Sequence, residues 1–254
     1  MTEKVLSGKR AVVTGASSGM GAAIALRFAA EGADVWAVGG GNAEGLKETI
    51  GGCASRGVRA NGKGYDFSDS RQGGEAVREG AGFLNGLDIL VNCAGTRNFK
   101  PIIEVTDDEI DYMFEVNAKS FYFAAREAAR IMSPQGSGHI LMMGSISGHR
   151  ARAERSLYCG TKAAIELLTK SLAKELGPVG LRVNCLAPGL VESGRVKTKM
   201  EDEPGYTERR LKGISLGRFG KPENIAAAAV FLVSPDNDFM NGAIVEIDGA
   251  STTG

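Results

Sequence analysis

The sequence has few of the residues that build metal sites and disulfide frameworks. Its 254 residues include only two histidines and four cysteines, and no two cysteines form a C-x-x-C pair. Scattered thiols and so few histidines are not typical of a zinc site or of a disulfide-stapled fold. The sequence therefore predicts a reduced protein that holds no metal.

Two kinds of hydrophobic segment are also missing. The first ten residues are polar and lack the apolar core of a signal peptide. No run of 18 apolar residues occurs anywhere in the chain, so the sequence predicts no membrane-spanning segment. We expect a cytoplasmic protein without a membrane partner.

Charge of one sign is not in excess. Lys and Arg together number 30, and so do Asp and Glu. A dedicated nucleic-acid binder normally carries a basic excess, so we expect a small-molecule substrate and no nucleic-acid partner. Hydrophobic residues make up 43% of the chain and charged residues 24%. These shares are typical of a globular protein and exclude a disordered one.

Short apolar runs alternate with longer helical patterns along the whole chain. Seven runs are predicted strands, at 10–14, 34–38, 58–65, 88–92, 139–143, 181–186 and 243–247. Six predicted helices lie between them, at 20–31, 43–56, 70–85, 107–132, 157–176 and 222–233. This alternation predicts a single α/β domain over residues 1–254. The domain would be a doubly wound, seven-stranded parallel sheet with helices on both faces.

Glycine is unusually frequent, and some of it lies inside predicted helices. The 36 glycines are roughly twice the usual share. Because each glycine inside a helix costs about 1 kcal/mol relative to alanine, we expect helices 43–56 and 70–85 to be short or frayed. Residues 190–215 are rich in charge, contain one proline, and interrupt the alternation. They are a candidate substrate loop, either a mobile flap or a surface helix–loop insertion.

A glycine-rich loop follows the first predicted strand. Residues 14–21 read T-G-A-S-S-G-M-G and lead directly into a helix. Glycines let the backbone approach a pyrophosphate closely, and the helix start offers free N–H groups and a positive dipole end. The strand–turn–helix context predicts a dinucleotide site. The alternative is a plain structural turn.

Further motifs follow in a recognisable order. Three motifs occur at characteristic spacing. They are N-C-A-G at 92–95, a Y-x-x-x-K pattern formed by Tyr158 and Lys162 thirteen residues after Ser145, and Pro188-Gly189 after the sixth strand. From about residue 8 to 249, the chain resembles the short-chain dehydrogenase/reductase family. The resemblance implies a Rossmann fold and the reversible oxidation of a secondary alcohol by a nicotinamide cofactor.

The loop and the resemblance together give a set of candidate cofactor-binding residues. Asp66 follows the third strand, where the family contacts the adenine ring, and Ser193 falls where the family contacts the carboxamide. The full set is Gly15, Ser17, Ser18, Gly19, Met20, Gly21, Gly39, Gly40, Asn42, Asp66, Phe67, Asn92, Ala94, Gly95, Tyr158, Lys162, Pro188, Gly189, Val191 and Ser193.

The end of the second strand bears on the choice of cofactor. A 2′-phosphate needs a cationic partner, whereas a free 2′-hydroxyl is normally held by Asp or Glu at this point. The sequence has neither and reads G-G-G-N at 39–42, with Asn42 as a candidate partner of the ribose. We predict NAD, with NADP as the alternative.

Four residues are candidates for catalysis. Tyr158 and Lys162 are four apart, so they share one helix face. A nearby ammonium favours a phenolate, which can exchange the alcohol proton; the alternative is a surface pair. Ser145, at the end of a strand, can stabilise charge on the substrate oxygen, or can simply form a turn. Asn117 is by default a polar core residue, and the resemblance implies that it holds a water that relays protons to Lys162.

The loops after the fourth, fifth and sixth strands are rich in positive charge. They carry Arg97, His149, Arg150, Arg152, Arg155, Arg195, Lys197 and Lys199, against only Glu154 and Glu192. This local excess predicts an anionic substrate, with Arg97, Ser147, His149 and Arg155 as candidate substrate residues. The alternative is that these charges are solvated, or contact the acidic stretch 104–115 of another subunit.

Several identities for the substrate stay open. A hydroxysteroid resembling a bile acid, or another cyclic alcohol with an anionic group, competes with a 3-oxoacyl thioester. Reductases of the latter typically have Arg in place of Ser18 or near Gly40, and this chain does not. A catalytically silent dinucleotide-binding scaffold is disfavoured because all four catalytic candidates are present. The resemblance also implies a homodimer or homotetramer built through helices 107–132 and 157–176.

Overall fold

Seven parallel strands form one sheet in the order β3-β2-β1-β4-β5-β6-β7. The structure is a computed structural model that describes residues 4–252, apart from the side chain of Arg195. The strands are β1 Arg10–Thr14, β2 Asp34–Gly39, β3 Ala60–Gly64, β4 Ile89–Asn92, β5 Gly138–Met143, β6 Leu181–Pro188 and β7 Ile244–Ile247. The order confirms the predicted doubly wound sheet. It reverses between β1 and β4, and such folds bind ligands beyond the carboxyl ends of the strands at this point.

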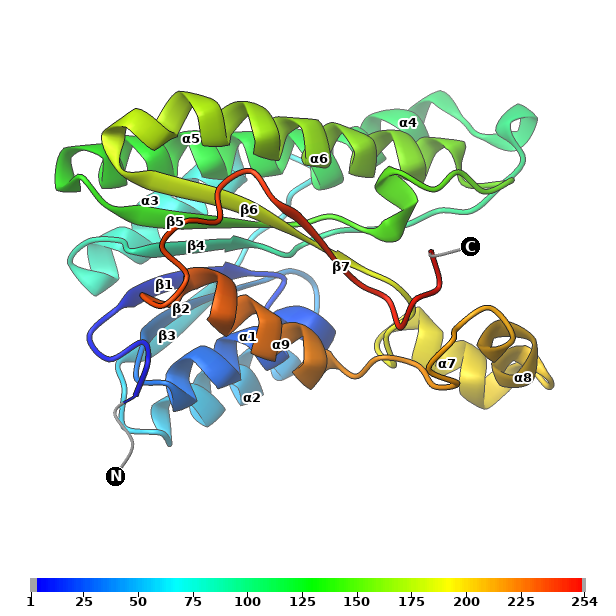
Figure 1. Ribbon diagram of the computed structural model, residues 1–254, viewed down its shortest axis with the longest axis horizontal. Helices are drawn as coiled ribbons and strands as arrows, with labels where there is room; N and C mark the ends of the chain where they lie inside the picture. The colour runs from blue at the N-terminus through cyan, green and yellow to red at the C-terminus, as the bar shows by residue number, and fades with distance from the viewer. Residues whose placement is uncertain (1–3, 253–254) are drawn as a thin grey trace.

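Helices cover both faces of the sheet (Figure 1). One face carries α1 Gly19–Ala30, α2 Ala43–Ala54 and α9 Pro222–Val233. The other carries α3 Gln72–Leu84, α4 Asp107–Phe114, α5 Ser120–Met132 and α6 Ser156–Leu176. Short turns of other helix types are η1 Ile102–Glu104, η2 Glu115–Lys119, η3 Ser133–Gln135, η4 Ile146–Gly148 and η5 Gly177–Val179. Among the described residues, no helix is both long and apolar enough to cross a membrane.

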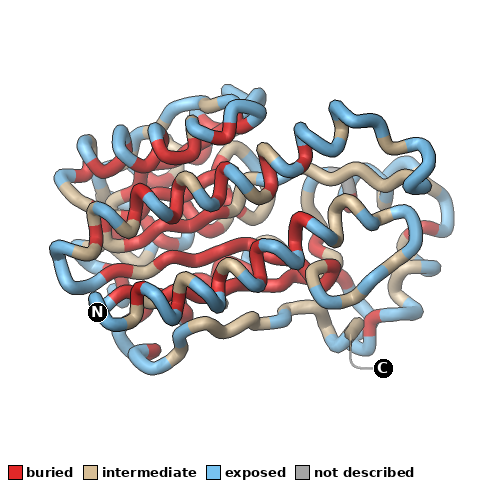
Figure 2. Tube along the Cα trace, turned by 90° about the horizontal axis from the view of Figure 1, so that it is seen from above, coloured by how far each residue is buried: buried red, intermediate tan, exposed pale blue. Residues whose placement is uncertain are grey.

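The strands are buried on both sides because each face packs against its own helix layer. Along β1, Ala11 and Val13 belong to the core under α1 and α9, whereas Val12 belongs to the core under α3 and α5. In Figure 2 long stretches of buried residues follow the strands, whereas buried and exposed residues alternate along the helices. This double burial explains the continuous apolar runs from which the strands are predicted.

The expectation of short or frayed helices at 43–56 and 70–85 is wrong. Helix α2 has 12 residues and α3 has 13. A Cβ on Gly73 would lie 2.5 Å from the carbonyl oxygen of Ser120, and one on Gly80 would lie 2.6 Å from Trp36 Cδ1. These glycines let α3 lie directly against α5 and β2. The close packing offsets the low helix propensity of these glycines. The sequence-based expectation took only the propensity into account.

The interrupting segment forms two short helices beyond the carboxyl end of β6. These are α7 Arg195–Asp202 and α8 Tyr206–Leu211, and Figure 1 shows them apart from the main helix layers. A small core of Val196, Tyr206, Ile214 and Phe219 holds them together. A backbone bridge between Val191 and Gly220 closes the base of the insertion. Of the two alternatives for this segment, the structure shows the helix–loop insertion.

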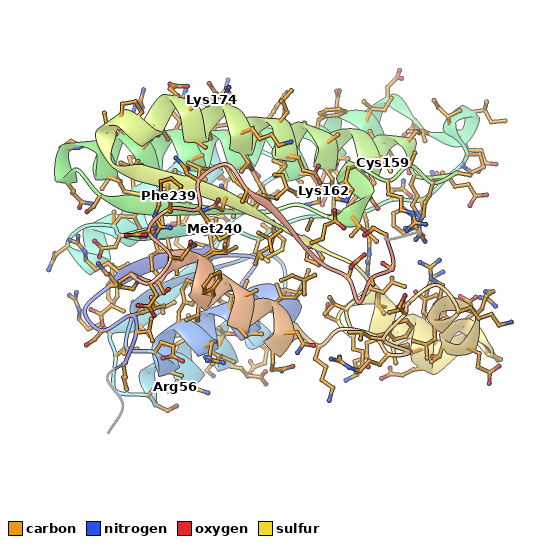
Figure 3. The ribbon with its side chains drawn as sticks, in the orientation of Figure 1. Arg56, Cys159, Lys162, Lys174, Phe239 and Met240 are labelled. Carbon is orange, nitrogen blue, oxygen red and sulfur yellow. The ribbon has the colours of Figure 1, made fainter. Side chains whose placement is uncertain are left out.

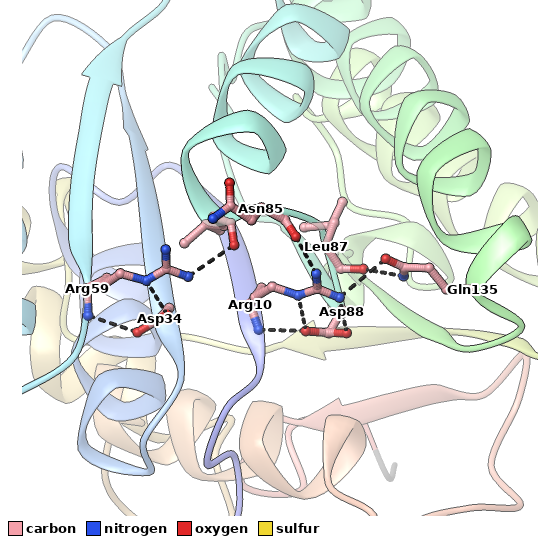
Figure 4. A network of polar contacts seen from close by, with 8 residues as sticks. Arg10, Asp34, Arg59, Asn85, Leu87, Asp88 and Gln135 are labelled. Atoms are coloured by element: carbon pink, nitrogen blue, oxygen red, sulfur yellow. Dashed lines mark hydrogen bonds and ion pairs between the residues drawn. The ribbon is translucent and has the colours of Figure 1, made fainter.

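Arginine–aspartate pairs lie at the opposite, amino-terminal ends of the strands (Figure 4). Arg10 contacts Asp88 through both its backbone N–H and its guanidinium, each at 2.8 Å. Arg59 forms the corresponding pair with Asp34, again at 2.8 Å. The pairs join neighbouring strands where β1, β2, β3 and β4 begin. This end of the sheet is therefore fixed by compensated charges.

The packing of α3 leads to a paired test. Gly80→Ala should lower the free energy of unfolding by about 1–3 kcal/mol, because the new methyl group overlaps Trp36 and Val12. Gly82→Ala, in the same helix, meets nothing within 4 Å and should raise it by up to about 1 kcal/mol. Urea unfolding measures both. Equal effects of the two substitutions would contradict this account of the glycines.

Candidate active site

The glycine-rich loop lies against the end of β4. Gly15 has a φ of 69°, and a Cβ there would lie 2.8 Å from the backbone nitrogen of Ala94. A Cβ on Gly21 would lie 2.2 Å from the carbonyl oxygen of Gly15. Thr14 Oγ1 accepts hydrogen bonds from the N–H groups of Cys93 and Ala94, at 2.9 and 3.1 Å. The loop is thus fixed across the reversal point of the sheet.

The start of α1 is suited to bind an anion. Ser18 precedes the helix in an extended conformation and, within the described residues 4–252, makes no capping hydrogen bond through its side chain. The first turn contains no acidic residue. The first N–H groups of α1 and its positive dipole end therefore lie beside a loop with few side chains. Together they fit the binding of a dinucleotide pyrophosphate.

The end of β2 presents an open glycine surface. Gly40 and Gly41 are exposed, and a Cβ on Gly41 would meet nothing within 4 Å. Asn42 begins α2: its Oδ1 accepts from the Gly45 N–H at 3.0 Å, and its Nδ2 donates to the Ser17 carbonyl at 3.1 Å. Asn42 therefore ties α2 to the glycine-rich loop. Its predicted contact with the ribose stays a prediction.

Asp66 and Phe67 follow β3 and differ in exposure. Asp66 is exposed, whereas Phe67 is buried. The Ser68 N–H donates to Asp66 Oδ1 at 2.9 Å, and hydrogen bonds with Ser68 lower the pKa of Asp66 below its usual value. The Asp66 carboxylate is thus charged and exposed at neutral pH. Its predicted contact with the adenine ring stays a prediction.

Asn117 lies in a π-helical turn between α4 and α5. The turn η2 interrupts what the sequence predicts as one regular helix over 107–132, and such turns are frequent at functional sites. Asn117 is fully buried. Its Nδ2 donates to the Thr96 carbonyl at 2.8 Å and to Thr161 Oγ1 at 3.2 Å, and its Oδ1 accepts from the Thr96 N–H at 2.7 Å. The amide therefore joins the loop after β4 to α6.

Lys162 is a buried cation on α6 (Figure 3). It is 5% exposed, and its Nζ donates to the Met143 carbonyl at 2.8 Å. Nζ also lies 5.4 Å from the ring centre of Phe121 and 5.9 Å from that of Tyr158. Burial of an ammonium group requires such partners. The ammonium group is held beside the phenol ring, as the i, i+4 spacing predicts.

Ser145 and Tyr158 open into one cleft at the carboxyl end of the sheet. The cleft encloses about 280 Å³, and Met20, Pro188 and Gly189 from the predicted cofactor side also line it. Ser145 precedes the turn η4, and its Oγ accepts from the Ser147 N–H at 3.1 Å. The structure therefore brings the serine and the tyrosine together with part of the predicted cofactor surface.

Three of the four predicted substrate residues line this cleft, and one does not. Arg97, Ser147 and Arg155 are part of its wall. His149 is not, and this expectation needs correction. Its Nδ1 lies 2.9 Å from Glu166 Oε1 and its Nε2 lies 3.2 Å from Glu246 Oε1. The imidazole ring therefore bridges Glu166 on α6 and Glu246 on β7, and these two contacts hold it outside the cleft.

Sequence reasoning missed several residues of the cleft. Phe99, from the loop after β4, stacks edge-on against Tyr158 with ring centres 5.7 Å apart. Tyr206, Arg209 and Arg210 reach the cleft from α8. The basic pair at 209–210 is visible in the sequence. Its approach to Ser145 and Tyr158 depends on the fold of the insertion, which no local pattern shows.

Comparison with known proteins agrees with this geometry. A family model described as "Enoyl-(Acyl carrier protein) reductase" matches residues 15–252. A 4-formylbenzenesulfonate dehydrogenase of Comamonas testosteroni is 40% identical, with 94% of this chain and 96% of that protein covered. A gluconate 5-dehydrogenase of Gluconobacter oxydans is 35% identical, with 97% and 96% covered.

A solved structure is equally similar. A short-chain dehydrogenase from Burkholderia cenocepacia, in complex with NADP, is 35% identical with a TM-score of 0.90, and 97% of this chain and 99% of that chain are covered. Fold and site thus define an oxidoreductase that acts on alcohol and ketone groups with NAD(P). The chain belongs to the short-chain dehydrogenase/reductase family.

The junction of the glycine-rich loop with β4 can be tested directly. Thr14→Val should lower the free energy of unfolding by about 1–3 kcal/mol, because it leaves two partly buried N–H groups without their acceptor. Thr14→Ser retains the hydroxyl and should stay close to the wild type. Urea unfolding compares the three proteins. If the valine and serine variants are equally stable, the hydroxyl does not hold this junction.

Proposed function

We propose that the protein interconverts a secondary alcohol that bears an anionic group and the corresponding ketone, with Tyr158 as the proton donor and acceptor. One observation carries the proposal: Ser145 and Tyr158 share a cleft with several arginines. A single domain would then serve both cofactor and substrate, with 190–215 as the substrate loop.

The residues of the chain divide the chemistry among them. Ser145 Oγ binds the substrate oxygen and stabilises charge that develops on it. Tyr158 transfers the alcohol proton. The Lys162 ammonium group lies beside the Tyr158 ring, where it would stabilise negative charge that develops on the phenol oxygen, and it would contact the nicotinamide ribose. When bound, the nicotinamide supplies the hydride exchange, and the protein supplies position and electrostatics.

Asn117 acts in this proposal through its position. Its side-chain amide is occupied by Thr96 and Thr161. The water that would relay protons to Lys162, as the resemblance implies, would therefore bind the main-chain carbonyl of Asn117. The amide keeps the turn η2, the loop after β4 and α6 in register around Lys162.

The names of two relatives support an anionic substrate. One relative is a dehydrogenase of a sulfonate and the other of gluconate, a carboxylate. Both anions are compact, and this favours a small cyclic or short-chain substrate over one resembling a bile acid. A 3-oxoacyl thioester is the second candidate, favoured by the acyl-carrier description of the matching family model.

A preference for NAD rests on the residues after β2. Gly40, Gly41 and Asn42 supply no cation for a 2′-phosphate. They also supply no carboxylate to repel one, so the preference should be mild. The relative from Burkholderia cenocepacia is a complex with NADP, so the proposed preference for NAD rests on residues 40–42 of this chain alone.

A homodimer or homotetramer belongs to the same proposal. Tyr122 on α5 and Leu167 on α6 are 52% and 70% exposed, and large exposed apolar side chains favour contact with another subunit. A cytoplasmic location is supported by the four cysteines, all of which are free thiols.

The mechanism predicts different results for two substitutions. Tyr158→Phe should lower kcat at least about 100-fold and leave the Kd of the cofactor nearly unchanged, because only the proton donor is lost. Lys162→Ala should lower kcat and also weaken cofactor binding. Steady-state kinetics and titration of cofactor fluorescence measure the two effects. Turnover like that of the wild type in Tyr158→Phe would contradict the mechanism.

The cofactor preference has its own test. The wild-type protein should show a higher kcat/KM with NAD than with NADP. Gly40→Arg should shift this ratio at least about tenfold toward NADP, because the guanidinium supplies the missing partner of the 2′-phosphate. A tenfold preference of the wild type for NADP would overturn the assignment.

A further inference from the structure

Positive charge in the cleft is only partly compensated. Among the side chains that the structure describes, six basic ones and one carboxylate, that of Glu203, line the cleft. Glu203 pairs with Arg209 and lies 3.4 Å from Lys199. The Glu203 carboxylate therefore already contacts two cations of the α7–α8 insertion.

Arg152, Arg155 and Arg210 form a group without a carboxylate. Among residues 4–252, with the side chain of Arg195 left aside, none of the three has an acidic group within 4.0 Å. Arg210 Nε is buried and has no hydrogen-bond partner in this part of the chain. A buried N–H group without a partner is costly. A ligand that supplies an acceptor would remove that cost.

The three guanidinium groups also crowd one another. Burial, followed by the charge of Arg210, lowers the pKa of Arg152 below its usual value. Burial, followed by the charges of Arg152 and Arg210, does the same for Arg155. Guanidinium groups stay protonated in proteins all the same. Three like charges therefore share a partly buried space, and a bound anion would relieve their repulsion.

The group lies close to the catalytic phenol. The Arg155 guanidinium stacks on the ring of Phe99 at 4.2 Å, and Phe99 contacts the Tyr158 ring edge-on at 5.7 Å. Phe99 therefore places one apolar aromatic surface against both the Arg155 guanidinium group and the Tyr158 ring. A substrate that fits this arrangement carries its anionic group across a ring or a short carbon chain from the carbinol carbon.

We propose that Arg152, Arg155 and Arg210 form the anion subsite of the substrate cleft, which takes a sulfonate or a carboxylate, and that Arg210 is a specificity-determining residue supplied by the α7–α8 insertion. The planar fork of arginine suits the oxygen geometry of both groups. This inference rests on the proposed function, since it names what recognises the anionic group of that substrate.

The binding test does not require turnover. Benzenesulfonate, with benzenesulfonamide as its neutral counterpart, is titrated into the protein at saturating NAD by calorimetry. The wild type should bind benzenesulfonate and not the sulfonamide. Arg210→Met should weaken benzenesulfonate binding at least tenfold, Arg210→Lys should weaken it less, and the cofactor Kd should not change. Arg27→Met is the matched control, because Arg27 on α1 is paired with Glu31 and is not part of the cleft wall, and should change binding less than threefold.

The kinetic test uses matched ketones. Arg210→Met should lower kcat/KM for 4-acetylbenzenesulfonate at least tenfold and leave that for 4-acetylbenzenesulfonamide unchanged. Rising salt should raise the KM of the sulfonate alone. Thermal unfolding of each variant identifies loss of fold, and Arg152→Met serves as a second variant should Arg210→Met be unstable.

The outcomes separate the two proposals. Benzenesulfonate binding that depends on Arg210, without turnover of either ketone, would support the subsite and contradict the proposed reaction. Turnover that depends on Tyr158, with benzenesulfonate affinity equal in wild type and Arg210→Met, would overturn the subsite alone. A parallel rise in the cofactor Kd would also overturn it, since the arginine would then belong to the cofactor site. Turnover of 3-oxoacyl thioesters with no response to benzenesulfonate would favour the second candidate function instead.

Discussion

The buried ammonium group of Lys162 sets the requirements for the rest of the site. A charge that is 5% exposed must be stabilised by the protein, and here the Met143 carbonyl and the faces of two aromatic rings do so. Its surroundings leave little room. A Cβ on Gly95 would lie 3.9 Å from Lys162 Nζ and 3.2 Å from Asn117 Oδ1. The position of the phenol, and with it the chemistry, therefore depends on how closely β4, β5, η2 and α6 approach one another.

That close approach relies on residues without a side chain and on one buried amide. Gly15 brings the glycine-rich loop against the segment after β4, Gly21 lets the start of α1 lie against Gly15, and Asn117 joins the next loop to α6. Much of this could be predicted from the sequence. Apolar runs mark the strands because both faces of the sheet are buried. The glycine-rich loop and the Tyr158–Lys162 spacing indicate the site, because they are local patterns with a direct physical reason.

The features that could not be predicted depend on contacts between distant segments. The glycines of α3 look unfavourable in the sequence, and only the neighbouring Ser120 and Trp36 reveal their purpose. His149 lies in a basic stretch, but Glu166 and Glu246 hold its ring outside the cleft. The approach of Arg210 depends on how α7 and α8 pack. In each case, a residue's own type and neighbours in sequence were compatible with more than one environment.

The two ends of the sheet show how the same residue type serves different purposes. At the amino-terminal end, Arg10 and Arg59 each have an aspartate at 2.8 Å, and these pairs tie strands together. At the carboxyl end, Arg152, Arg155 and Arg210 line one cleft, and burial together with the neighbouring arginine charges lowers the pKa of Arg152 and Arg155. Like charges brought together without acids destabilise the fold unless a ligand compensates them. The chain has as many acidic as basic residues, so its composition would allow these arginines to be paired with carboxylates, as Arg10 and Arg59 are. Their placement together, in the cleft that Tyr158 also lines, is the observation on which the proposed anion subsite rests.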